Sequence, residues 1–135
     1  MEQKDVDKLL SEKLEDGEHV SPVLPGGIKN YLIDIDGTIC NNTWGEYEKA
    51  FPYPDRIECV NQLYDSGNHI TYFTARGMGT CDGDVLRAYA KLYNFTYEQL
   101  SEWGCKFHEL RLGKPNADYY IDDKGIFDKN FFEKL

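Results

Sequence analysis

The sequence has few basic residues, no long apolar run, and no apolar stretch at its N-terminus. Each of these absences excludes a class of protein. Fifteen Lys and Arg residues against 24 Asp and Glu residues give a formal net charge of -9. Nucleic acids are bound by basic surfaces, so this charge argues against a nucleic-acid partner. No apolar stretch approaches the ~20 residues that span a bilayer. The N-terminus MEQKDVDKLL is unlike a secretory signal. We therefore expect a cytoplasmic protein with no membrane partner.

The cysteines are also too few and too scattered for a cysteine-based site. No two of them form a CxxC pair, whereas a zinc site needs clustered ligands and a secreted disulfide framework needs a cysteine-dense chain. We expect unpaired thiols at Cys40, Cys59, Cys81 and Cys105.

The 135 residues fit one domain preceded by a short extension. Residues 1–29 are interpreted as an N-terminal helix, near 2–15, and a Pro- and Gly-containing linker. The predicted helix has an apolar stripe, and it needs a surface of its own domain or of a second subunit to cover that stripe, so a homo-oligomer is possible. Residues 30–135 form the predicted main domain.

Short apolar runs alternate with helical patterns along the main domain. Strands are predicted at 31–35, 69–74, 105–110 and 118–121. Helices are predicted from Asp55, from about Asp84, from a capping box at Thr96-x-x-Gln99, and from Asp128. This alternation favours an α/β fold, a three-layer Rossmann-like sandwich with a mostly parallel central sheet covered on both faces.

Polar residues follow the predicted strands at the ends where such sheets bind ligands. Asp34 and Asp36 end the first strand, Thr74 ends the second, and Asp122 and Asp123 end the last. Carboxylates gathered at one edge repel each other unless a cation relieves the repulsion, and Mg²⁺ prefers oxygen ligands. The pattern therefore predicts a magnesium site, although Asp36-Gly37 by itself is also a common turn pair.

These residues resemble the four motifs of the haloacid dehalogenase-like (HAD) hydrolase superfamily. The first motif is similar to Tyr-Leu-Ile-Asp34-Ile-Asp36-Gly-Thr, and the second to Ile-Thr-Tyr-Phe-Thr74. The third is matched by Lys114 in Leu-Gly-Lys-Pro, and the fourth by Tyr-Tyr-Ile followed by two aspartates. The resemblance runs from about residue 30 to 125.

The resemblance implies a phosphohydrolase that works through an aspartyl-phosphate. Asp34 is then the nucleophile that attacks phosphorus, and Asp36 is the general acid–base group. Thr74 and Lys114 hold the equatorial oxygens of the phosphoryl group.

The resemblance also implies how Mg²⁺ is bound. Its ligands are then Asp34, the backbone carbonyl of Asp36, and Asp122, while Asp123 orients a metal-bound water or Lys114.

Neither gap that usually carries a cap domain is long enough to do so, since these gaps are only Ile39–Pro54 and Gly77–Asp84. The chain therefore resembles capless members, which include sugar-phosphate phosphatases and polynucleotide 3′-phosphatases. Its acidic charge disfavours the second group. The resemblance extends to short capless proteins of surface-carbohydrate synthesis, and it implies a small phosphorylated metabolite as substrate, with a sugar phosphate of carbohydrate synthesis as the first expectation.

Three further residues are candidates for contact with that substrate. Trp44 in the first gap is placed to pack on a sugar face, and Ala75 and Arg76 follow Thr74. Arg76 either grips a phosphate or carboxylate or forms a surface salt bridge. A phosphate-binding or regulatory module without turnover remains the alternative function, alongside a polynucleotide 3′-phosphatase.

Overall fold

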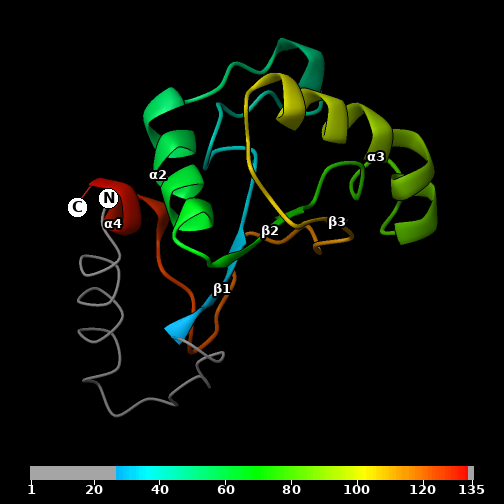
Figure 1. Cartoon of the computed structure of the whole chain (residues 1–135). Coiled ribbons are helices and arrows are strands. Elements are labelled where there is room, and N and C mark those ends of the chain that lie inside the picture. The colour runs from blue at the N-terminus through cyan, green and yellow to red at the C-terminus, as the bar shows by residue number, and fades with distance from the viewer. Residues whose placement is uncertain (1–26, 134–135) are drawn as a thin grey trace.

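The computed structural model describes residues 27–133, and the predicted helix at 2–15 lies outside them. The described chain is a mixed α/β fold built on a three-stranded parallel sheet of order β1-β2-β3 (Figure 1). These strands are β1 (Asn30–Ile33), β2 (His69–Thr74) and β3 (Glu109–Leu112). The α/β class and the parallel pairing predicted from the sequence are confirmed.

The two faces of the sheet differ in polarity because alternate residues of a strand point to opposite sides. Ile33 pairs with Tyr72, and Tyr72 pairs with Leu110, so these three side chains share the face that forms the core. Leu32 belongs to the other face and is 65% exposed. Helices of the described chain pack on the core face (Figure 1).

Helix α2 (Pro54–Asp65) follows the prediction closely. Proline suits the first helical turn because its missing N–H has no helical partner there. Ile57, Val60 and Leu63 recur at helical spacing and are buried against the sheet. Gly67, at φ 95°, ends the segment after the helix.

Helix α3 (Val85–Glu102) replaces two predicted helices with one. The Asp84 side chain accepts a hydrogen bond from the Arg87 backbone N–H (3.2 Å), as an N-cap does. The predicted capping box at Thr96 and Gln99 is wrong, since both residues lie inside this helix with buried side chains. Leu86, an apolar residue of its first turn, is 82% exposed.

Strand β3 begins later than predicted, at residue 109 instead of 105. The first hydrogen bond to β2 comes from the His108 backbone N–H, which donates to the Ile70 carbonyl (2.9 Å). The first paired residues are Thr71 and Glu109, so His108 lies just before the strand. The strand predicted at 118–121 is wrong, because residues 118–121 are exposed coil and bend. The Tyr120 hydroxyl bonds to the Pro115 carbonyl and ties this segment to itself.

A last helix, α4 (Asp128–Glu133), begins at Asp128 as predicted and buries Phe131 against the Tyr31 ring of β1. Arg56 of α2 donates to the Asp128 carboxylate (2.7 Å), which joins the two helices. Phe127 is 62% exposed, so it is not part of this contact.

The cysteines and the helix lengths bear on two expectations from the sequence. All four cysteines lie in the described range and none is in a disulfide, as predicted. Across residues 27–133, every helix is too short or too polar to cross a lipid bilayer. The first gap holds a short 3-10 helix, η2 (Tyr47–Lys49), within a loop.

Candidate functional site

The candidate site lies at the carboxyl edge of the sheet, where the chain turns sharply after β1. Asp34 directly follows the strand, and the Ile35 carbonyl accepts hydrogen bonds from the backbone N–H groups of Thr38 and Ile39 (3.0 and 2.9 Å). Gly37 sits in this turn at φ 82°, a conformation that strains other residues. The turn places Asp36 close to the second strand's end.

Asp34 faces Lys114 across the edge of the sheet. The Lys114 ammonium lies 3.6 Å from the Asp34 carboxylate, and the Lys114 backbone N–H donates to the Thr74 carbonyl (3.2 Å). Burial raises the pKa of Asp34 above its usual 3.8, and the Lys114 charge offsets part of that rise. The segment after β3 therefore passes the end of β2 and brings Lys114 to Asp34, consistent with the site that the resemblance implies.

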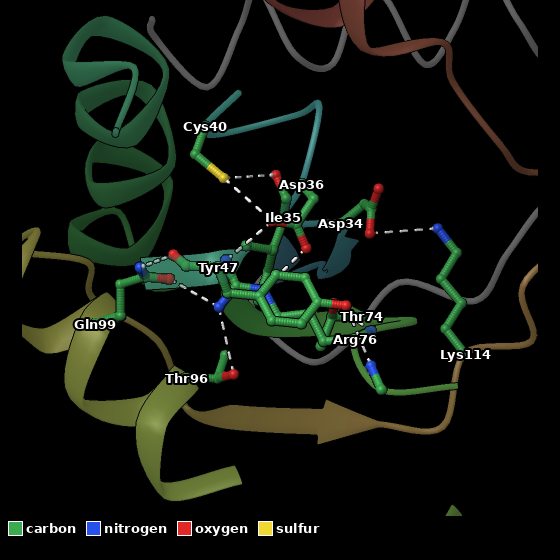
Figure 2. Close-up of polar contacts among 11 residues, drawn as sticks. Asp34, Ile35, Asp36, Cys40, Tyr47, Thr74, Arg76, Thr96, Gln99 and Lys114 are labelled. Carbon is green, nitrogen blue, oxygen red and sulfur yellow. Dashed lines mark hydrogen bonds and ion pairs between the residues drawn. The ribbon is translucent and has the colours of Figure 1, made fainter. Parts of the chain in front are cut away.

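Asp36 is bound by Arg76 in a two-pronged ion pair. Arg76 Nε donates to Asp36 Oδ2, and Nη2 donates to Oδ1, both at 2.9 Å (Figure 2). The Arg76 residue is only 1% exposed. Parallel N–H···O bonds of this kind fix orientation as well as supply energy.

The other side of the Arg76 guanidinium is held by helix α3 and by the loop after β1. Nη1 donates to Gln99 Oε1 (2.7 Å) and to Thr96 Oγ1 (3.4 Å), and the group lies over the Tyr47 ring at 4.6 Å. Gln99 Nε2 donates to the Tyr47 carbonyl (2.8 Å). Figure 2 shows Arg76 enclosed by these partners. Neither sequence alternative for Arg76 describes this buried cluster.

The other residues predicted to contact substrate differ in how far they are exposed to solvent. Thr74 is 1% exposed, and its Oγ1 accepts a hydrogen bond from the Arg76 backbone N–H (3.1 Å). Ala75 is partly buried in the following turn, where its carbonyl accepts from Met78 N–H (3.0 Å). Trp44 is 90% exposed, on the loop that also carries Tyr47.

The second acidic pair does not form a metal-holding group with the first among the described residues. Asp122 and Asp123 lie in an exposed segment, and Asp122 Oδ1 accepts from the backbone N–H groups of Lys124 and Gly125 (2.6 and 2.5 Å). Between residues 27 and 133, no three His, Cys, Asp or Glu side chains are grouped to hold a metal ion. The predicted meeting of four carboxylates depends on a strand at 118–121, and that strand is absent there.

Asp34 nevertheless supplies a carboxylate, the kind of ligand that a magnesium ion binds. Mg²⁺ is commonly held by one or two carboxylates together with water and substrate phosphates. The Asp34 side chain is a partly exposed oxygen donor, and burial makes its charge unfavourable, a cost that a cation would relieve. The carboxylate oxygens of Asp36 are instead occupied by Arg76.

Sequence reasoning missed the residues that surround Arg76. Thr96 and Gln99 are polar side chains on the buried side of α3, and polar groups at such positions usually have specific partners. Cys40, expected from the sequence only to be an unpaired thiol, is fully buried with its thiol 3.6 Å from Asp36 Oδ1. Burial, with the nearby Asp36 charge, raises the pKa of Cys40 to about 12, so it stays a neutral thiol.

Comparisons with known proteins add one structural neighbour. No family model and no curated protein matches the chain. A crystal structure of a structural-genomics target from Vibrio cholerae is similar, with 28% sequence identity and a TM-score of 0.72. The match covers 77% of this chain and 87% of that chain. The neighbour's name states no activity, so the similarity bears on the α/β fold.

Proposed function

We propose that this chain is a HAD-type phosphatase, which hydrolyses phosphate monoesters of small metabolites through a phosphorylated Asp34. The observation that supports the proposal most is the pairing of Asp34 with Lys114 beside Thr74, at the carboxyl edge of a parallel sheet. Ligands of open α/β sheets bind at that edge. A carboxylate and an ammonium 3.6 Å apart present a nucleophile next to a cation that attracts phosphate.

The proposed reaction divides the work between the two aspartates. Asp34 attacks phosphorus and the ester oxygen leaves with a proton from Asp36, which splits one displacement into two. Asp36 then takes a proton from the water that releases phosphate. Lys114 stabilises the negative charge of the transferred group, and donors prearranged around that charge are often the largest contribution to such catalysis.

Magnesium is part of the proposal, with Asp34 as its carboxylate ligand. When bound, the ion would neutralise charge on the phosphoryl oxygens. We propose also that the open face of the sheet, which includes Leu32, is covered in the complete fold, giving the three-layer sandwich expected from the sequence. Parallel sheets are almost always covered on both faces, and Leu32 is 65% exposed on the open one.

The test is hydrolysis of 4-nitrophenyl phosphate with Mg²⁺, followed by a panel of sugar phosphates. We expect Asp34→Asn to lower turnover by more than about a hundredfold, because the amide is a poor nucleophile of the same shape. Asp55→Asn is the matched control, since Asp55 is exposed at the start of α2, and it should retain full activity.

Two results would contradict the proposal. Asp34→Asn with near-normal turnover would show that another group attacks phosphorus. Undiminished turnover after complete chelation would remove Mg²⁺ from the reaction. Acid-quenched mass spectrometry should find one added phosphate on the peptide that contains Asp34, and a phosphate elsewhere would count against its role.

A phosphate-binding module without turnover is the second candidate. It is favoured by one observation: among the described residues, Asp34, Asp36, Asp122 and Asp123 do not form a group that could hold a metal ion. This candidate predicts saturable binding of a phosphate ester by calorimetry with no hydrolysis, and with loss of binding in Lys114→Met.

A further inference from the structure

The buried cluster around Arg76 has no part in the reaction as proposed so far, although it contacts one of the two reacting carboxylates. All three nitrogen atoms of the guanidinium donate to side chains, namely Asp36, Gln99 and Thr96. A residue that is 1% exposed and bonded in this way is not available to grip a substrate. Its chemistry is directed at Asp36.

The geometry shows what Arg76 does to Asp36. Two parallel bonds of 2.9 Å hold both carboxylate oxygens, which fixes the plane and rotation of the group. Oδ1 also has the Cys40 thiol at 3.6 Å, whereas Arg76 Nε is the partner of Oδ2. A carboxylate oxygen has two lone pairs, so Oδ2 keeps capacity for one more hydrogen bond.

Arg76 is itself fixed from two separate parts of the chain. Gln99 and Thr96 hold it from α3, and Tyr47 lies beneath it from the loop after β1. Gln99 bonds to both Arg76 and the Tyr47 backbone, so one side chain ties these elements together. Groups that must act within a fraction of an ångström are commonly supported by such a second layer.

We propose that Arg76 is a positioning residue that orients the Asp36 carboxyl group, protonated on Oδ2 at this step, for proton transfer to the leaving group, and that Gln99 holds Arg76 in place. This inference rests on the proposed phosphatase function. Arg76 touches no substrate and acts through Asp36 alone. Lysine cannot replace it, because a single ammonium lacks the planar fork that holds both oxygens.

The test compares esters whose leaving groups differ in their need for a proton. A nitrophenolate leaves without much help, whereas a simple alkoxide needs an acid, and such help is worth roughly a hundredfold or more. In Arg76→Lys we expect kcat on an alkyl phosphate to fall by about tenfold to a hundredfold. On 4-nitrophenyl phosphate it should fall by less than about threefold, with little change in KM. Gln99→Met should show the same selective loss, smaller in size.

A double-mutant cycle tests whether Arg76 works through Asp36. In the Asp36→Asn background, Arg76→Lys should change kcat on the alkyl phosphate by less than about twofold, because the group it orients is gone. Arg56→Met is the matched control, since Arg56 also pairs with an aspartate but at the α2–α4 contact. Its variant should show no difference between the two esters.

The outcomes separate this inference from the function on which it rests. An active wild type whose Arg76→Lys and Gln99→Met variants lose both esters equally would overturn the inference alone. The inference would also be overturned if Arg76→Lys lowered kcat on the alkyl phosphate as much in the Asp36→Asn background as in the wild type. A wild type that hydrolyses neither ester with Mg²⁺ would overturn the proposed function and this inference with it. If Arg76→Lys fails to fold by circular dichroism, Gln99→Met and its cycle with Asp36→Asn decide the question.

Discussion

Gly113 turns the chain from the end of β3 to Lys114, and the closeness of its neighbours predicts a large cost for adding a side chain there. Its φ is 96°, and an added Cβ would lie 2.9 Å from Cγ1 and 3.4 Å from Cγ2 of Val85. A valine has one strongly preferred rotamer in a helix, so Val85 cannot easily rotate away. Gly113→Ala therefore combines backbone strain with a steric clash.

Gly83 provides the matched control because it has the strain without the clash. Its φ is 77°, and an added Cβ would meet nothing within 4 Å. We expect Gly83→Ala to lower the free energy of unfolding by about 1–2 kcal/mol, the cost of a left-handed backbone for alanine. Gly113→Ala should lose about 1–3 kcal/mol more, the usual cost of overpacking.

Urea unfolding followed by circular dichroism measures these differences. In a chain of this size, each 1 kcal/mol corresponds to roughly 3–4 °C in Tm. The double variant Gly113→Ala with Val85→Ala should relieve the steric clash and keep the backbone strain. Its free energy of unfolding should therefore approach that of Gly83→Ala. Equal losses for the two glycine variants, or no recovery in the double variant, would refute the steric reasoning.

Two further predictions concern charged groups. Arg56 Nη1 donates to Asp128 (2.7 Å) and to the Thr38 carbonyl (2.9 Å), so Arg56→Met should lower the free energy of unfolding by about 2–3 kcal/mol. Lys49→Met, which removes an exposed ion pair, should change it little by the same urea assay, and equal losses would contradict the argument. Because burial raises the pKa of Asp34, the ionised carboxylate is less favourable in the folded than in the unfolded protein, and stability falls as pH rises above 3.8. The free energy of unfolding of Asp34→Asn, relative to that of wild type, should therefore increase as the pH rises from acidic to neutral. A difference between the two proteins that stays constant with pH would contradict this prediction.

The sequence alone determined the elements whose signals are local. β2 occupies the predicted residues because its apolar run is short and bounded by polar and Gly residues. Helix α2 follows from apolar spacing between Pro54 and Gly67. Because parallel strands present their carboxyl ends at one edge, the ends of β1 and β2 were expected to lie together. The resemblance to the third motif added Lys114 to that site, and its ammonium lies 3.6 Å from the Asp34 carboxylate.

Tertiary contacts decided the features that have no local signal. The sequence Asp-Tyr-Tyr-Ile at 118–121 matches a strand pattern, but a strand forms only where another strand pairs with it. Here the Tyr120 hydroxyl instead bonds to the Pro115 carbonyl. Thr96 and Gln99 have the spacing of a capping box, yet their side chains bond to an arginine 20 and 23 residues away.

Arg76 is the clearest case of a role that only the folded chain assigns. On the sequence it is one basic residue among many acidic ones, with no pattern that selects a partner. Folding takes it out of water, and a buried guanidinium is stable only if its charge and its N–H groups are matched. Asp36 supplies the charge, and Gln99 and Thr96 supply the other acceptors. They lie within reach only because the turn after β1 and helix α3 pack on the same edge of the sheet.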